Sequence, residues 1–331
     1  MQSIFQSISK RIQYLKRIFQ AYISSHDSQL TFWHGTPQIN NEFIPWKLDQ
    51  YPMLFDYKAN YQGPKDNQGI PLLDYRGNIG KQYNPIAISQ YGLGNFNLYR
   101  KTGNRERLES FLAAADWLVD NLEPNEYGIK VWMHHFDFEY RDTLKSPWYS
   151  GLAQGQGLSV LVRAYELNKE KQYLDAAISA YKAFEKSIDE GGVIAYNKAG
   201  HTWIEEYIVH PPTHVLNGLI WALWGVYDYY LATSFHHPKN LYERVIQTII
   251  DHIHQYDLGY WSLYELSGTK LKMIASPFYH SLHIVQLTVM FRLTEEKLFL
   301  NFANKWTSYQ QSALFRFIAL IHKTLFKVFY Y

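Results

Sequence analysis

Apolar residues recur along much of this chain at the spacing of amphipathic helices, and the helices that this spacing predicts come in pairs. In each pair the first helix is apolar or rich in small residues, and the second has one apolar face. A short polar turn joins the two. The four predicted pairs are 86–99 with 105–121, 150–167 with 171–187, 214–232 with 238–256, and 279–293 with 295–311.

The pairs recur about every 65 residues, a period typical of a helix pair followed by a long return. A helix that is apolar all round is expected to be surrounded by others, whereas an amphipathic helix keeps one face in water. The fold class predicted is therefore mainly α, an incomplete (α/α) toroid of about four helix pairs. Its long connections, 123–149, 188–213 and 257–278, all end where an inner helix begins, so distant residues should converge on one rim.

Short alternating stretches within these connections, at 128–133, 192–196 and 259–264, predict small β-hairpins on that rim. Residues 30–83 are rich in Pro, Gly, Asn and Asp, which indicates an irregular or β-containing arm. We therefore divide the chain into an N-terminal helix and arm (1–83), a toroid catalytic domain (84–312) and an amphipathic C-terminal tail (313–331).

The composition narrows the classes of function. The chain has 331 residues and a net charge of +2, so no overall field favours nucleic acid. It has no cysteine, which excludes disulfides, thiolate nucleophiles and Cys-ligated metals, and no other good set of metal ligands stands out. The 28 Tyr, 19 Phe and 10 Trp mostly fill the core, but aromatic faces also stack on sugar rings.

The sequence also bears on location. No stretch approaches the length of a membrane span, and the N-terminus lacks the apolar core of a signal peptide, so a cytoplasmic location is expected. Segments 4–23 and 314–331 are amphipathic and basic. Each is expected either to pack on the domain or to lie on an anionic membrane surface. Peripheral association at the inner membrane face and a homodimer are both left open.

Polar and aromatic side chains suited to chemistry gather where the inner helices begin. Ser150 is a predicted N-cap, and the glutamines just after it must either satisfy a loop or face a ligand. Glu205, Glu206 and Tyr207 precede the third inner helix, and Tyr264 and Tyr279 surround the start of the fourth. Substrate-binding candidates on this rim are Gln90, Tyr91, Trp132, Trp148, Tyr149, Gln154, Gln156, Asn217 and His280.

Several of these residues lie in ordered blocks that resemble a known family. The blocks are Trp148-Tyr149-Ser150 through Gln156, Glu205-Glu206-Tyr207 with Val215-Leu216-Asn217-Gly218, and Tyr279-His280. Over about residues 84–309 the chain resembles the C-terminal domain of D-glucuronyl C5-epimerases. Known members invert C5 of glucuronic acid units in a polymer to give iduronic acid. The resemblance implies an (α/α) toroid, a uronic-acid-containing polysaccharide as partner and no organic cofactor.

The resemblance also implies Glu206, Tyr207, Tyr264 and Tyr279 as catalytic residues. The C5 hydrogen is a very weak acid, so its removal needs a positioned base and a neutralised substrate carboxylate. Inversion then needs a proton donor on the opposite face of the ring. We assign Tyr207 and Tyr279 as the proton-transfer pair, Glu206 as the group that polarises or protonates the substrate carboxylate, and Tyr264 as an assisting residue.

Three other functions remain open on sequence alone. A lyase would share the C5 proton abstraction but expel the C4 substituent. An inverting glycoside hydrolase needs two carboxylates across the scissile bond, whereas Glu205 and Glu206 are adjacent. A non-catalytic glycan-binding protein would keep only the groove. Animal epimerases carry Arg and His where Ser267 and Gly268 follow Tyr264 here, which points to a different uronic-acid polymer.

Overall fold

The computed structural model describes residues 35–75, 77, 79–141 and 143–330. They form two compact units, Gln38–His252 on the one hand and residues 35–37 with 253–330 on the other. None of the helices in this part of the chain is both long and apolar enough to span a membrane. The predicted amphipathic segment 4–23 lies outside the described residues, and the predicted division at 83/84 and 312/313 stays a prediction.

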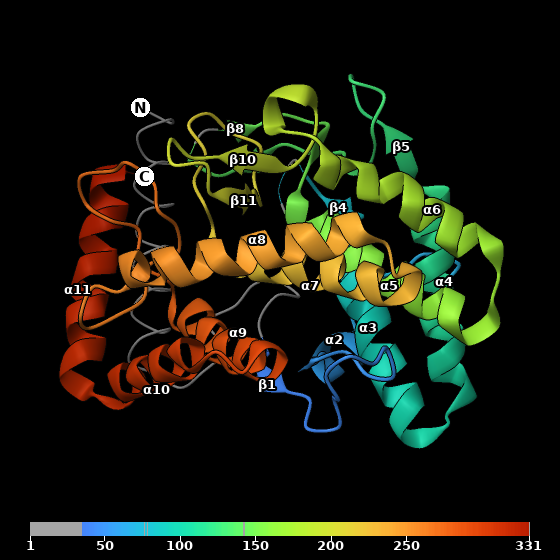
Figure 1. Ribbon diagram of the computed structural model, residues 1–331, viewed down its shortest axis with the longest axis horizontal. Helices are drawn as coiled ribbons and strands as arrows, with labels where there is room; N and C mark the ends of the chain where they lie inside the picture. The colour runs from blue at the N-terminus through green and yellow to red at the C-terminus, as the bar shows by residue number, and fades with distance from the viewer. Residues whose placement is uncertain (1–34, 76, 78, 142, 331) are drawn as a thin grey trace. The chain divides into compact units, whose positions relative to one another are not determined.

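The first unit contains three of the predicted helix pairs (Figure 1). They are α3 (Pro85–Thr102) with α4 (Arg105–Asp120), α5 (Gly151–Asn168) with α6 (Lys171–Tyr181), and α7 (Leu216–Thr233) with α8 (His236–His252). The main departure is the end of α6, which was predicted at residue 187. There the chain tightens into the 3-10 turns η1 (Lys182–Glu185) and η2 (Ile188–Glu190).

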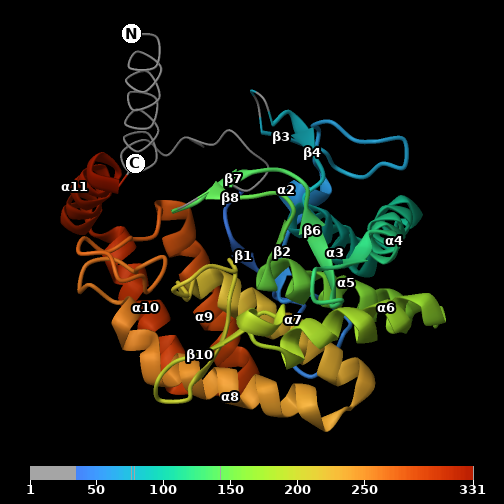
Figure 2. The ribbon, with the colours of Figure 1, turned by 90° about the horizontal axis from the view of Figure 1, so that it is seen from above.

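The first helix of each pair is an inner helix, as its apolar composition predicts. Helix α5 packs against both α3 and α7, while α4, α6 and α8 lie outside them (Figure 2). Glycines set the approach of α5 to α7. A Cβ on Gly225 would overlap the backbone of Gly155, and one on Gly155 would overlap the backbone of Ala222. The small residues at these positions therefore let the two helix backbones touch.

Short strands cover the starts of these helices. Strands β5 (Leu122–Pro124), β6 (Lys130–His134) and β9 (Trp148–Tyr149) form one antiparallel sheet. The hairpins are β7 (Phe138–Glu139) with β8 (Thr143–Leu144) and β10 (Ile194–Tyr196) with β11 (Thr202–Ile204). The strands predicted at 128–133 and 192–196 are confirmed, and they place the connections over the ends of α5 and α7.

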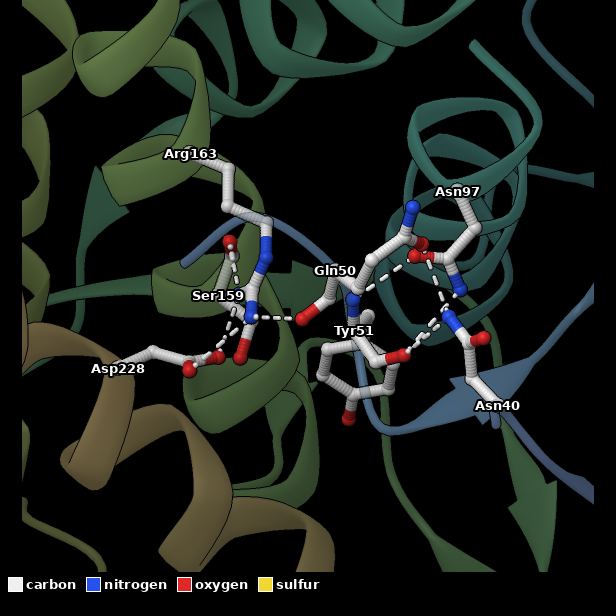
Figure 3. A network of polar contacts seen from close by, with 7 residues as sticks. All are labelled: Asn40, Gln50, Tyr51, Asn97, Ser159, Arg163 and Asp228. Atoms are coloured by element: carbon white, nitrogen blue, oxygen red, sulfur yellow. Dashed lines mark hydrogen bonds and ion pairs between the residues drawn. The ribbon is translucent and has the colours of Figure 1, made fainter. Parts of the chain in front are cut away.

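The arm before α3 contains small β elements, as predicted, and one short helix. The elements are β1 (Gln38–Ile39) with β2 (Met53–Leu54), α2 (Asp56–Ala59), and β3 (Leu73–Asp74) with β4 (Lys81–Gln82). Asn97 of α3 accepts a hydrogen bond from the Tyr51 backbone N–H at 2.8 Å, and Asn40 donates to the Tyr51 carbonyl at 3.0 Å (Figure 3). The Asn97 side chain therefore fastens the backbone of the arm to α3, and Asn40 braces the same point from within the arm.

A buried ion pair completes this network (Figure 3). Arg163 of α5 contacts both carboxylate oxygens of Asp228 on α7, at 2.5 and 3.1 Å. The same guanidinium donates to the carbonyls of Ser159, at 3.0 Å, and Gln50, at 3.2 Å. Because both charged groups are almost fully buried, their mutual pairing is a condition of packing these helices together.

The second unit contains the fourth predicted pair and the C-terminal tail. Its elements are η3 (Ile253–Tyr256), α9 (Pro277–Thr294), α10 (Lys297–Gln311) and α11 (Ala313–Tyr330), and α11 packs against α10. The strand predicted at 259–264 is wrong for the described residues. That segment makes only single bridges, Asp257 to Ser262 and Leu263 to Ile274, because it pairs with a different neighbour at each point.

Candidate functional site

A cavity of about 420 Å³ opens in the first unit beside strands β6 and β9. Its wall contains Tyr127, Trp148 and Tyr149 among aliphatic side chains, and two of these, Trp148 and Tyr149, are predicted substrate-binding residues. Such a cavity offers flat apolar faces against which a sugar ring can stack. Its lining residues are Asn125, Glu126, Tyr127, Met133, Leu144, Pro147, Trp148, Tyr149, Ile188, Ile208 and His210.

Trp148 is held rigidly in this wall. Its indole N–H donates to the carbonyl of Phe136 at 2.9 Å, and its ring lies parallel to that of His134 with centroids 3.8 Å apart. Burial lowers the pKa of His134 to about 3, so this imidazole is neutral near pH 7. Trp148 thus presents a fixed indole with a neutral ring stacked against it.

Tyr149 points its hydroxyl toward the carbonyl of Gly192, 3.4 Å away. Burial raises the pKa of Tyr149 to about 12. The phenol therefore keeps its proton at neutral pH, which makes it a hydrogen-bond donor and not a base.

The predicted catalytic residue Tyr207 extends the aromatic wall. Its ring lies 4.1 Å from that of Tyr140 and 6.2 Å from that of Trp148, centroid to centroid. The Tyr140 hydroxyl bonds to Thr213 Oγ1 at 3.1 Å, just before α7 begins. Sequence reasoning missed Tyr140 because no motif or periodicity marks it. The structure brings Tyr207 and Trp148 together although they lie far apart in the sequence.

The two adjacent glutamates have different surroundings. The fully buried carboxylate of Glu205 accepts from the backbone N–H groups of Thr213, at 3.2 Å, and His214, at 3.0 Å. It also contacts His214 Nδ1 at 2.5 Å. His214 adopts a left-handed backbone conformation with φ of 52°. Glu205 therefore fixes the turn that leads into α7, where a negative charge also suits the helix dipole.

Glu206 lies beside the first turn of α7. Asn217 Nδ2 donates to Glu206 Oε2 at 3.4 Å, so the structure brings these two predicted site residues together. A Cβ on residue 218 would overlap the same carboxylate oxygen, and only glycine leaves that space open. The sequence Asn217-Gly218 thus supplies both a donor and the room for the Glu206 carboxylate.

Three predicted residues with side-chain amides, Gln90, Gln154 and Gln156, make hydrogen bonds inside the helix core. Gln154 accepts from the Trp132 backbone N–H at 2.9 Å and donates to the Ala180 carbonyl at 3.2 Å. Gln156 accepts from Gln90 at 3.1 Å, which joins α5 to α3. These contacts give both amide atoms of Gln154 a partner, whereas Gln90 Oε1 and Gln156 Nε2 are buried without a hydrogen-bond partner among the described residues.

The remaining predicted residues of this unit are also buried. The indole N–H of Trp132 donates to the Leu118 carbonyl at 2.7 Å, and its ring fills the space beside Gly157. The Tyr91 hydroxyl lies 3.3 Å from Lys65 Nζ. Ser150 caps α5 by accepting from the Ala153 N–H, as predicted. A substrate-binding role for Trp132 and Tyr91 stays a prediction.

In the second unit, Tyr264 and Tyr279 meet edge to face with ring centroids 5.0 Å apart. Tyr279 lies in the first turn of α9, which Ser276 caps by accepting from the Tyr279 N–H. The Tyr264 N–H donates to the Met273 carbonyl at 2.8 Å. Two of the predicted catalytic residues are therefore neighbours at the start of one helix.

His280 lies next to this pair in sequence but is fully buried. Its Nδ1 lies 2.8 Å from Ser262 Oγ, its Nε2 lies 3.0 Å from the Trp306 carbonyl, and its ring stacks on Trp261. Burial lowers the pKa of His280 to about 4, so the ring is neutral near pH 7 and Nε2 is the donor to the carbonyl. Its predicted role in binding substrate stays a prediction.

Comparison with known proteins identifies a family and two relatives to which this chain is similar. The family described as "D-glucuronyl C5-epimerase C-terminus" matches residues 125–308. A D-glucuronyl C5-epimerase of Caenorhabditis elegans is 29% identical over 233 residues, which are 65% of this chain and 38% of that protein. An uncharacterized protein of Methanocaldococcus jannaschii is 28% identical over 244 residues, 69% of this chain and 78% of that one.

A solved structure shows the fold. A family 76 glycoside hydrolase from a bovine Bacteroides thetaiotaomicron strain aligns with a TM-score of 0.50 and 13% identity, over 72% of this chain and 49% of the hydrolase. With the four helix pairs, this likeness confirms the fold class as mainly α, of the (α/α)-toroid type. At such low identity it carries the fold alone.

Proposed function

This chain belongs to the family of D-glucuronyl C5-epimerase C-termini, and on that premise we propose that it is a polysaccharide uronate C5-epimerase. It would invert D-glucuronic acid-type units to L-iduronic acid-type units within a polymer. The observation that carries the proposal is the position of Tyr207. Its ring contacts Trp148 in the wall of the cavity, and Tyr207 directly follows Glu206 in the sequence. A proton-transfer candidate thus lies beside a surface suited to sugar rings.

The reaction has two proton transfers. One tyrosinate removes the C5 hydrogen, and the electron pair left on C5 is delocalised into the substrate carboxylate. A tyrosine on the other face then protonates C5 and inverts it. We assign these roles to Tyr207 and Tyr279. Glu206, in its protonated form, donates a hydrogen bond to the substrate carboxylate and so stabilises the negative charge that develops there. Tyr264, in ring contact with Tyr279, orients the Tyr279 side chain.

Trp148 and Tyr149 are proposed to bind the polymer. The rigid indole of Trp148 offers a stacking face. The Tyr149 hydroxyl directs its proton to the Gly192 carbonyl, so its oxygen is oriented to accept a hydrogen bond from a sugar hydroxyl. Apart from two tyrosines, the ionisable lining residues of the cavity are Glu126 and His210, with no Lys or Arg among them. This lining favours a polymer in which uronic acids alternate with neutral sugars over a densely sulfated one.

The test is solvent-deuterium exchange at C5, followed by NMR on a panel of glucuronic acid polymers that differ in linkage. The wild type should incorporate deuterium at C5 without cutting the chain. Tyr207→Phe should slow the exchange by about 100-fold or more, the usual contribution of general acid–base catalysis. Tyr196→Phe is the matched control. Because Tyr196 is exposed on β10, this variant should catalyse C5 exchange at the wild-type rate.

The other functions have their own signatures. An unsaturated product absorbing in the near ultraviolet, with falling chain length, would identify a lyase. Exchange by Tyr207→Phe at the wild-type rate would remove Tyr207 from the mechanism. Binding of a polymer without any exchange would leave a glycan-binding protein and contradict the epimerase proposal.

A further inference from the structure

Helix α11 carries a row of exposed apolar side chains along its whole length. Leu314, Phe317, Ile321, Leu325 and Val328 are 63%, 57%, 45%, 45% and 54% exposed. Their spacing of three or four residues places them on one face of the helix. A continuous apolar face of this kind in water marks an interaction surface, unlike single exposed apolar residues.

The rotation of α11 is fixed by its other face. Leu320 and Phe326 are buried, and two polar bonds tie the helix to the loop before α9. Lys323 Nζ donates to the Ile274 carbonyl at 2.6 Å, and His322 Nε2 lies 2.8 Å from the Lys272 carbonyl. The apolar row therefore lies on the side of α11 opposite Leu320, Lys323 and Phe326 and is held there by packing.

Basic residues flank the row. Besides the buried Lys323, helix α11 contains Arg316 and Lys327 and no acidic residue. The loop that it contacts carries Lys270 and Lys272, both exposed. Over residues 253–330 there are eight Lys and Arg but only four Asp and Glu. Of these acids, Glu265 is buried and Asp257 pairs with Lys305 at 2.6 Å. The surface around the apolar row is therefore positive.

We propose that α11 is an interfacial helix that lies on an anionic lipid surface. The apolar row would enter the boundary between headgroups and acyl chains, while Lys270, Lys272 and Lys327 would contact anionic headgroups. A second copy of this chain fits the surface less well, because a symmetric dimer through this face would bring two positive flanks together. The proposal stands apart from the epimerase reaction, since none of these residues belongs to the catalytic set.

Vesicle flotation of the full chain tests the proposal. Vesicles of phosphatidylcholine mixed with phosphatidylglycerol should carry the protein at low salt, and less of it at high salt. Vesicles of phosphatidylcholine alone should carry little. Phe317→Ser with Leu325→Ser should lower the partition coefficient about tenfold or more through lost apolar insertion. Lys270→Gln with Lys272→Gln should lower it about fivefold for each lysine.

Controls separate this helix from other surfaces. Ile44→Ser removes an apolar side chain of similar exposure, 51%, from the first unit and should leave flotation unchanged. Full flotation of the Phe317/Leu325 variant would overturn the proposal and assign lipid binding elsewhere in the chain. Absence of flotation, or a wild-type dimer in light scattering that this variant converts to a monomer without lipid binding, would also overturn it. The experiment measures partition of the protein between solution and vesicles, so its result does not depend on whether the epimerase proposal holds.

Discussion

At the scale of single residues, neighbours in sequence have separate tasks. Glu205 and Glu206 follow strand β11 where the chain bends, and their side chains meet different neighbours. Glu205 is enclosed by three donors from Thr213 and His214. Glu206 instead meets Asn217 in the space that Gly218 leaves. The sequence showed two carboxylates before a helix but could not show which of them the turn had already engaged.

This difference predicts opposite results for two matched variants. Glu205→Gln should lower the free energy of unfolding by about 2–3 kcal/mol, because it weakens charge-assisted hydrogen bonds in a buried turn. Glu206→Gln should change stability less and reduce C5 exchange more. Urea denaturation of both proteins and exchange rates at equal folded fractions check this. A stable but inactive Glu205→Gln protein would reverse the two assignments.

At the scale of elements, contacts between helices hold the site together. Helices α5 and α7 touch through Gly155 and Gly225 and are joined by Arg163 and Asp228. These helices begin at the site, next to Trp148 and Tyr149 for α5 and next to Glu206 for α7. A substitution in the buried contact between α5 and α7 should therefore lower the free energy of unfolding. It should also displace the site residues at the starts of these helices.

Removal of the buried arginine tests this link. Arg163→Leu should lower the free energy of unfolding by about 3–5 kcal/mol, since Asp228 would remain as an uncompensated buried charge. Replacing Asp228 by Leu in the same protein should restore part of that loss. Arg100→Leu is the matched control. Its ion pair with Asp49 is exposed, so it should cost about 1 kcal/mol or less. Equal losses at both arginines would contradict the argument.

At the scale of the whole molecule, buried bases shape the dependence of stability on pH. Burial lowers the pKa of His134 to about 3 and of His280 to about 4, from an ordinary 6.5. It also lowers the pKa of Lys58 and Lys323 to about 7, from an ordinary 10.5. In each window the unfolded chain binds a proton that the folded chain does not, so stability falls as the pH falls.

The protein should therefore be more stable at pH 9 than at pH 7, and less stable again at pH 5. Each group contributes a slope of up to about 1.4 kcal/mol per pH unit within its own window. Denaturant midpoints across this range measure the effect. Lys323→Met should flatten the segment above pH 7 and leave the segment below pH 6.5 unchanged. A flat profile in the wild type would show that these bases are protonated in the folded state.

The sequence by itself determined the helix pairs, their order and much of the rim. Helix periodicity, the Ser150 cap and the strands at 128–133 and 192–196 depend on residues close in the chain, so a local pattern could predict them. Such a pattern could not separate a strand from isolated bridges at 259–264, where Ser262 pairs with Asp257 on one side and Leu263 with Ile274 on the other. The resemblance to the epimerase family also rests on the blocks that contain Glu206, Tyr207 and Asn217.

Only the tertiary structure decided which of these side chains are available for chemistry. It enclosed Glu205 and left Glu206 beside Asn217, joined Gln90 to Gln156 inside the core, and set Tyr140 and Tyr207 against the wall that holds Trp148. The physical reason is that burial, pairing and pKa depend on groups brought together from distant parts of the chain. Residue type and spacing identified the candidate site residues. Packing between distant parts of the chain determined the burial and the hydrogen-bond partners of each one.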